Sequence, residues 1–269
     1  MRRETVTSAS NPKIRNLFAL QEKSKARREQ GLFVVEGRRE LEHCIEAGFS
    51  IRTLFVCPEI AGQDFSEELF CHSERSEESL VVEIPEALYR KVAYRESTEG
   101  IIAEVEYKER TLSDLQLPEN PLIMVLESVE KPGNLGAVLR SADAAKADAV
   151  LICDPLTDLY NPNLIRASIG AVFSVPTVAC SSEEAIAFLK ERNVQILTAQ
   201  LQDSSLYYDV DMRRGTALVM GTESTGLTDI WRKAASAHIR IPMLGRLDSL
   251  NVSVSAAILL FEAVRQRQA

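Results

Sequence analysis

The second half of the chain alternates short apolar runs with helical patterns, and this alternation limits the possible folds more than any other feature of the sequence. Runs with the length and composition of strands lie at residues 121–128, 148–153, 194–199, 216–221 and 238–243. Helical patterns lie between or after them, at residues 135–146, 161–169, 182–192, 227–235 and 249–267. Strands separated by helices need crossover connections, so this order predicts an α/β fold with a parallel sheet and helices on both faces.

The first hundred residues predict a second, smaller α/β unit. Strand patterns lie at 32–37, 51–57, 80–84 and 100–107, with a helical stretch at 39–47. A Ser/Glu-rich stretch at about 64–79 has too few apolar residues to build a core, so we expect an exposed insertion. The polar passage 108–120 precedes the strongly apolar run that opens the second half. The sequence thus predicts a small domain over 1–107, a linker over 108–120 and a larger domain over 121–269.

Charge is distributed unevenly along the chain. The net charge is −8, but residues 1–39 carry ten Lys or Arg against four Glu, whereas residues 59–86 carry nine Asp or Glu against one Arg. Because binding to nucleic acid depends on the local field, the basic N-terminal region can contact RNA despite the overall sign. The candidate phosphate contacts are Lys23, Lys25, Arg27 and Arg28. On composition alone, a solvated charged helix over 21–30 explains the same residues equally well.

Cysteine and histidine usage points away from a metal centre. The five cysteines include no CxxC pair and the three histidines show no ligand spacing, so we expect neither a structural zinc nor a disulfide framework. We predict that the chain binds no metal. No apolar run is long enough to span a membrane, and the first residues lack the apolar core of a signal peptide. We therefore expect a cytoplasmic protein without membrane partners.

Polar motifs follow three of the predicted strands. After the strand at 122–128, Pro132-Gly133-Asn134 makes a turn, and Asn134 is placed to cap a helix that starts near Leu135 and carries Arg140. The N-terminus of such a helix binds anions readily. Alone, this motif would be a plain strand-to-helix turn with a surface arginine. Its GNLG order also lacks the G-x-G-x-x-G spacing of a dinucleotide fingerprint.

The second motif is the loop of ALVMGTESTGL. Four apolar residues run into Gly221, and a polar loop that contains Glu223 ends at Gly226. Two glycines that bracket a loop at the carboxyl end of a strand suit a backbone that approaches a ligand closely. Without the other motifs, an ordinary loop with a solvated glutamate would explain it.

The third motif joins the strand pattern at 238–243 to the last predicted helix. Ser249 is placed to cap that helix, and packing explains the apolar period that follows. Packing does not explain why small polar residues crowd the first turns. These residues are Ser249, Asn251, Ser253 and Ser255.

In this order, NLGAVLR, GTESTGL and IPM…SLNVSVSAAI resemble the three signature motifs of the SpoU family, within the SPOUT class of methyltransferases. The resemblance covers roughly residues 120–269 and includes ASIGAVFSVP at 167–176. The segments SASNPKIRNL and FVVEGRRELEHC look like the small RNA-binding domain, similar to a ribosomal L30e-type fold, that many members carry.

The resemblance implies a trefoil-knotted methyltransferase domain that forms homodimers with active sites at the subunit interface. It implies S-adenosylmethionine as cofactor, bound through backbone groups of Gly221, Ile241 and Leu250. It also implies methyl transfer to a ribose 2′-hydroxyl of structured RNA, with ribosomal RNA preferred over transfer RNA. The matching catalytic positions are Asn134, Arg140, Glu223, Ser249 and Asn251. The chain departs from the family pattern at Lys131, where an acidic residue is usual, and at Ala145-Lys146-Ala147, where Ala-Phe-Gly is usual.

Methyl transfer to a ribose oxygen requires alignment and an activated hydroxyl. A guanidinium, whose pKa lies above about 12, is a poor base. We therefore expect Arg140 to hold a phosphate and to stabilise developing alkoxide charge, with Glu223, Ser249 and Asn251 orienting it or the ribose.

Two other functions fit parts of the sequence. One is a non-catalytic RNA-binding protein that retains the fold, against which the intact Asn134, Arg140, Glu223 and Asn251 argue. The other is a nucleotide-binding oxidoreductase, against which the missing fingerprint argues. Binding of S-adenosylhomocysteine rather than NAD would decide between these functions.

Overall fold

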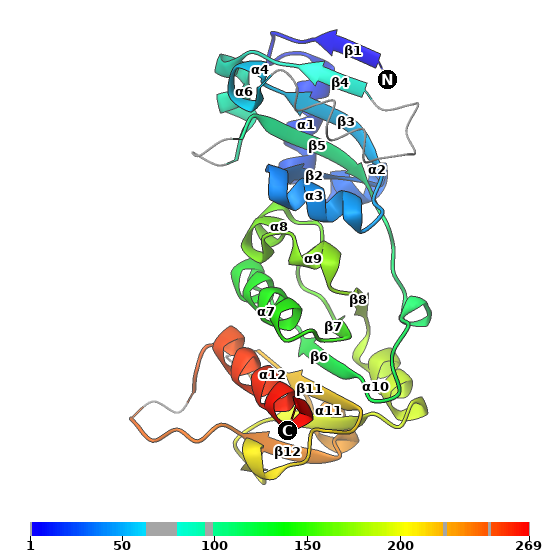
Figure 1. The fold of residues 1–269 in the computed structure, drawn as a ribbon, viewed down its shortest axis with the longest axis vertical. Coiled ribbons are helices and arrows are strands. Elements are labelled where there is room, and N and C mark those ends of the chain that lie inside the picture. Colours follow the sequence, from blue (N-terminus) through cyan, green and yellow to red (C-terminus); the bar gives the residue numbers. More distant parts are fainter. Residues whose placement is uncertain (1, 63–79, 95–98, 223–224, 247–248, 269) are drawn as a thin grey trace. The chain divides into compact units, whose positions relative to one another are not determined.

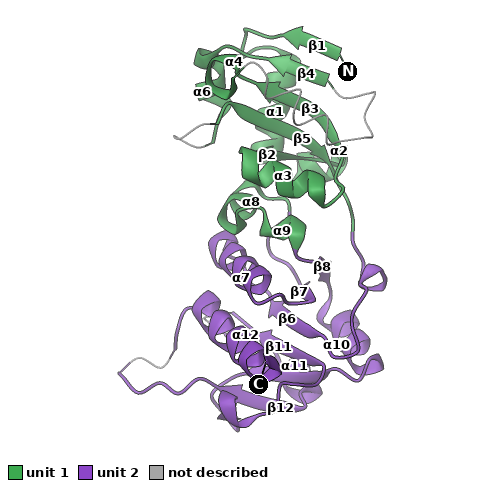
Figure 2. Ribbon diagram, viewed as in Figure 1, with its two compact units in different colours: residues 1–109, 160–174 green, residues 110–159, 175–269 purple. Residues whose placement is uncertain are grey.

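The computed structural model describes residues 2–62, 80–94, 99–222, 225–246 and 249–268. The chain divides into two compact units, one of residues 1–109 with 160–174 and one of residues 110–159 with 175–269 (Figure 2). The predicted insertion at 64–79 lies outside the described residues, as does Glu223 of the second motif.

The first unit is built on a five-stranded sheet (Figure 1). Its strands, in spatial order, are β1 (Arg2–Thr5), β4 (Leu80–Glu83), β3 (Ile51–Val56), β5 (Ile101–Glu106) and β2 (Leu32–Glu36). Only β5 runs antiparallel to its neighbours. The helices are α1 (Pro12–Glu22), α2 (Ser24–Gln30), α3 (Arg38–Glu46), α4 (Pro58–Ala61) and α6 (Glu86–Val92). Asn11 caps α1 by accepting a hydrogen bond from the backbone of Lys13.

A short segment from the second half of the chain completes the first unit. It contains α8 (Pro162–Ser168) and α9 (Ala171–Ser174). The ring of Tyr160 stacks on Phe33 of β2 with centroids 4.3 Å apart, and Phe173 packs against Phe49 at 5.2 Å. Because Phe33 and Phe173 are fully buried, these aromatic contacts hold the segment within the first unit.

The second unit is built on a seven-stranded sheet in which every strand pairs parallel to its neighbour. Its strands, in spatial order, are β10 (Ser205–Leu206), β12 (Ala237–Arg240), β9 (Gln195–Ala199), β11 (Thr216–Met220), β6 (Leu122–Glu127), β7 (Ala149–Cys153) and β8 (Thr177–Cys180). The predicted α/β fold with a parallel sheet is confirmed. The sequence did not predict β8 and β10, which have four and two residues and so give little periodic pattern.

Helices cover both faces of this sheet, as the sequence predicted. Helices α10 (Ser182–Glu191) and α11 (Asp229–Ala234) pack over the side chains of Ile123 and Val125 on β6. Because side chains alternate along a strand, the neighbouring residues of β6 face the other way, where α12 (Val252–Gln268) packs beside α7 (Pro132–Ala144). Two 3₁₀ turns complete the unit, η1 (Leu112–Asp114) and η2 (Tyr207–Asp209).

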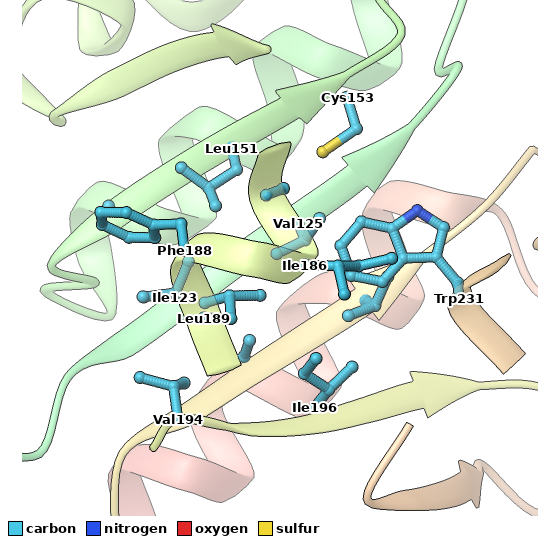
Figure 3. Packing of buried hydrophobic residues seen from close by; sticks show 14 of the residues in the cluster. Ile123, Val125, Leu151, Cys153, Ile186, Phe188, Leu189, Val194, Ile196 and Trp231 are labelled. Atoms are coloured by element: carbon cyan, nitrogen blue, oxygen red, sulfur yellow. The ribbon is translucent and has the colours of Figure 1, made fainter. Parts of the chain in front are cut away.

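The core under α10 and α11 surrounds Trp231 (Figure 3). Its indole Nε1 donates to Ser182 Oγ at 2.9 Å, so the one polar atom of this buried ring has a partner. Cys153 lies in the same core, with its Sγ atom 4.0 Å from that of Cys180 on the next strand. The contact with Cys180 and burial raise the pKa of the Cys153 thiol, so this cysteine behaves as an inert core residue.

Candidate active site

The second motif forms a tight loop directly after β11. The backbone N–H of Gly226 donates to the carbonyl of Thr222 at 3.0 Å, and the hydroxyls of Thr222 and Thr225 lie 2.7 Å apart. A Cβ atom on Gly221 would collide with the carbonyl group of Gly226, so no other residue fits this position without a shift of the loop. Gly226 itself has a φ of +68°, which favours glycine.

A buried carboxylate connects the second motif to the strand that precedes the first. Glu127, at the end of β6, accepts hydrogen bonds from the backbone N–H of Thr228 at 2.9 Å and from its hydroxyl at 2.5 Å. Thr228 is the N-cap residue of α11. Glu127 was not among the residues predicted from the sequence motifs. An acidic residue at the end of the apolar run LIMVLE was the feature that could have identified it, because a buried carboxylate needs partners.

A cavity of about 380 Å³ opens beside this loop. Its walls come from the ends of β9, β11 and β12 and from the start of α12, and the three residues predicted to bind the cofactor all line it. These residues are Gly221, Ile241 and Leu250. Ser249 lines the same cavity, so the structure brings together four of the predicted site residues.

The loop at 200–204 forms an outer wall of this cavity. Arg240, on β12, donates from Nη1 to the carbonyl of Ser204, and the hydroxyl of Ser204 donates to the carbonyl of Leu201 at 2.8 Å. Gln200, Leu201 and Arg240 all line the cavity. The pairing of β12 with β10 and the bond from Arg240 therefore hold this outer wall in place.

A second hollow lies next to the first and belongs to the first motif. It is lined by residues of the loop after β6, among them Ser128, Lys131 and Asn134. Thr222, Thr225 and Val252 line both hollows, so the two share a wall. A molecule in the first cavity therefore lies next to any group held in the second.

Asn134, in the lining of the second hollow, is hydrogen-bonded to Asn251. The side-chain Nδ2 of Asn251 donates to Oδ1 of Asn134 at 3.1 Å. The Oδ1 atom of Asn251 accepts from the backbone N–H of Ser253 at 3.0 Å and from its hydroxyl at 2.6 Å. Asn251 thus caps α12 and orients Asn134 with the same amide group.

Two predicted capping roles are wrong. Ser249 does not cap the last helix, because that helix begins at Val252 and Asn251 supplies the side-chain bond. Asn134 does not cap α7, which begins at Pro132 after Lys131. Pro132 starts the helix earlier because its fixed φ suits the first helical position and it needs no N–H partner there.

Arg140 stands apart from these contacts. It is exposed on α7, and it makes no hydrogen bond or ion pair within the described part of the chain. It lies six residues after Asn134, which places the two side chains about 120° apart around the helix axis. Within one chain, the structure does not bring Arg140 into either hollow.

The four basic residues predicted to contact RNA differ in exposure. Lys23, Lys25 and Arg28 are exposed around α2. Arg27 is only 2% exposed, and its Nη1 donates to the carbonyls of Leu20 and Gln21 at 2.7 and 3.2 Å. Its guanidinium donates to the free carbonyls at the end of α1 instead of facing solvent, so the prediction that Arg27 contacts a phosphate is wrong.

The described residues offer neither a metal site nor a membrane-spanning helix. No group of three or more metal-binding side chains occurs among them. None of the helices that the structure describes is long and apolar enough to cross a membrane.

The fold and the cavity at the strand ends are those of an RNA methyltransferase. A crystal structure of an RNA 2′-O ribose methyltransferase, 39% identical, superposes with a TM-score of 0.84 over 99% of this chain and 100% of that one. The AdoMet-bound rRNA methyltransferase from Sinorhizobium meliloti, 30% identical, superposes with a TM-score of 0.88 over 98% of each chain.

The chain belongs to the SpoU rRNA methylase family, whose model matches residues 121–261. A second model, the MRM3-like substrate binding domain, matches residues 11–103. Among named relatives, the chain is 41% identical over 176 residues to the 23S rRNA (guanosine-2′-O-)-methyltransferase RlmB of Salmonella typhi, a match that covers 63% of this chain and 72% of the relative. It is 26% identical to RlmP of Bacillus subtilis, over 95% of this chain and 97% of the relative.

Proposed function

We propose that this protein transfers a methyl group from S-adenosylmethionine to a ribose 2′-hydroxyl of structured RNA, with ribosomal RNA preferred over transfer RNA. The observation that carries the proposal is the pair of adjoining hollows, one walled by Gly221, Ile241 and Leu250 and the other lined by Asn134, which is hydrogen-bonded to Asn251. The relatives named as 23S rRNA 2′-O-methyltransferases support the choice of RNA.

The first cavity fits the proposed cofactor. Its volume lies at the lower end of the range for small-molecule sites, and the absence of a side chain at Gly221 lets a ligand approach the backbone. Gly221, Ile241 and Leu250 would hold the cofactor there, mainly through backbone groups. When bound, S-adenosylmethionine supplies an electrophilic methyl group on a sulfonium.

The residues around the second hollow would prepare the ribose. Asn134, held by Asn251, offers an oriented amide in the lining of this hollow. We propose that Arg140 holds a phosphate and stabilises negative charge on the 2′-oxygen as its proton leaves. Glu223 and Ser249 would orient the arginine or the ribose; Glu223 lies outside the described residues. Alignment of the 2′-oxygen alone lowers the barrier by several kcal/mol.

We also propose a homodimer, because Arg140 does not reach either hollow of its own chain. A second copy that covers α12 would bring one subunit's Arg140 to the other subunit's site. On α12, Val254 and Phe261 are 47% and 48% exposed and lie seven residues apart, which puts them on one face of the helix. An apolar stripe of this kind is suited to burial between subunits.

Three further proposals concern the fold. A trefoil knot in the second unit is supported by the packing of the last helix, α12, beside the first, α7, and by the place of β12 between β9 and β10. An L30e-like fold for the first unit is supported by its mixed five-stranded sheet. The domain division at 107 and 121 is supported by the ranges of the two family models. A cytoplasmic location stays a prediction.

The product tests the proposal directly. An unmodified 23S rRNA transcript is methylated with labelled cofactor and digested, and the label is located on ribose or base. A 2′-O-methyl group also blocks alkaline cleavage at its linkage, which gives a second readout. We expect label on ribose, and no labelling of DNA of the same sequence, because DNA lacks the hydroxyl. Label on a base nitrogen or carbon would refute the reaction. Binding of S-adenosylhomocysteine, with no binding of NAD, would exclude the non-catalytic and oxidoreductase alternatives.

A further inference from the structure

The first unit carries an exposed aromatic ring that is anchored by its backbone. Tyr94 follows the end of α6, and its backbone N–H donates to Oε2 of Glu36 at 2.8 Å. This bond ties the backbone of Tyr94 to the end of β2. The side chain is nevertheless 48% exposed, so the anchoring presents the ring to solvent instead of burying it.

A guanidinium lies over that ring. Arg166, on α8, has its Cζ atom 4.8 Å from the ring centroid of Tyr94. Its Nη2 donates to Oδ1 of Asn163 at 3.1 Å, one turn earlier on the same helix. Asn161 caps α8 by accepting from the backbone of Asn163, so the helix start that orients the arginine is itself fixed. The ring and the guanidinium therefore form a preorganised pair of planar groups.

Apolar, amide and acidic side chains surround this pair, and a basic residue lies nearby in the sequence. A small notch beside it is lined by Gln21, Val34, Glu36, Pro162 and Ile165 together with the pair itself, so one carboxylate lies among apolar and amide side chains. The amide of Gln21 donates to the carbonyl of Val92 at 2.8 Å, two residues before Tyr94. Exposed Lys23 is two residues from Gln21, which puts its Cα within roughly 7 Å of that of Gln21. Among the exposed basic residues around α2, Lys23 is therefore the one whose backbone lies near the notch.

We propose that Tyr94 and Arg166 form a stacking site for an unpaired base of the RNA substrate. RNA-binding proteins recognise splayed-out bases by stacking them on aromatic rings and guanidinium planes, and a neighbouring lysine meets the phosphate. The proposal rests on the proposed function, because it assigns a subsite to the same RNA. It places part of the RNA affinity outside the two hollows of the second unit.

Affinity for an unmodified 23S rRNA transcript tests the site. Stacking of one base is worth about 1–3 kcal/mol, so Tyr94→Ala should weaken binding by roughly 5- to 150-fold. Tyr94→Phe keeps the ring and should bind like the wild type. Arg166→Lys keeps the charge without the plane and should give an intermediate loss. The matched control is Tyr208→Ala, because Tyr208 is 46% exposed in the second unit and its ring packs against that of Tyr207 instead of a guanidinium.

Fluorescence reports stacking itself. The wild-type tryptophan, Trp231, is fully buried, so its emission provides a constant background. In Tyr94→Trp, a single-stranded adenosine decamer should quench the added emission, whereas in Tyr208→Trp it should not. Wild-type affinity in Tyr94→Ala, or equal quenching at both positions, would overturn the inference. If either result is obtained with a wild-type protein that methylates ribose, only the stacking site is refuted and the proposed function stands. If the wild-type protein does not methylate ribose, the proposed function itself is refuted.

Discussion

The side-chain amide of Asn251 donates to the side-chain oxygen of Asn134 at 3.1 Å, although the two residues are 117 positions apart. The same amide group caps α12 through its oxygen. Asn251 therefore links α12, the helix of the third motif, to α7, the helix of the first. Substitutions of Asn251 can separate its capping role from its bond to Asn134.

Asn251→Asp should separate them. Aspartate caps a helix as well as asparagine does, so stability should change little, but it cannot donate to Asn134, so methyl transfer should fall. Asn251→Ala should lose the cap as well and be destabilised by about 1 kcal/mol. Thermal unfolding and turnover measured on both variants test this. Full activity in the aspartate variant would mean that the Asn134 bond does not matter for the reaction.

Arg140→Ala should abolish methyl transfer and leave the fold and cofactor affinity unchanged. The side chain is exposed and lines neither hollow, so its removal costs no packing. Lys146→Ala, an exposed cation just past the end of the same helix, is the matched control and should keep its activity. Calorimetry with S-adenosylhomocysteine and a turnover assay give the two readouts. Near wild-type turnover without Arg140 would remove it from the mechanism.

Gly221→Ala should weaken cofactor binding by about tenfold or more, because overpacking of a closed site costs ~1–3 kcal/mol. The added methyl group meets the carbonyl group of Gly226, so the backbone at Gly226 has to move. Gly245→Ala is the control, since a Cβ there meets nothing within 4 Å. The measurement is the dissociation constant of S-adenosylhomocysteine for each of the two variants. Equal affinity in the two variants would contradict the assignment of this cavity.

Phe261→Glu should convert the proposed dimer to a monomer and eliminate activity. A charge on the apolar stripe of α12 cannot be buried between subunits without a partner. Gln268→Glu, at the exposed end of the same helix, introduces the same charge and should leave the dimer intact. Light scattering at micromolar concentration gives the mass of each variant. A wild-type protein that is monomeric and active would defeat this prediction.

Neutralising Lys23, Lys25 and Arg28 should weaken RNA binding and flatten its salt dependence, by up to about 0.9 in log–log slope for each lost duplex phosphate contact. Arg27→Ala should behave differently. It removes two hydrogen bonds to the end of α1, so it should lower the free energy of unfolding by about 1–3 kcal/mol and leave the salt slope unchanged. A triple variant with an unchanged slope would place the RNA on another surface.

The sequence by itself determined the α/β fold and the positions of the three motifs. The pattern of apolar residues along a segment is a local property of the sequence. The apolar runs at 122–127 and 216–220 therefore predicted strands β6 and β11 without knowledge of the neighbouring strands. Glycine at 221, followed by a polar loop, likewise indicated a close backbone approach. The resemblance of the motifs then named cofactor residues that all line one cavity.

Only the tertiary structure decided which polar groups meet. The bond between Asn251 and Asn134, and that between Glu127 and Thr228 across 101 residues, depend on the order of strands in the sheet, which no local pattern encodes. The structure alone also showed that Arg27 is buried and that the segment at 160–174 belongs with the first unit. A charged side chain looks the same in sequence whether it meets solvent or a carbonyl. Its environment is set by parts of the chain that folding brings together from far apart.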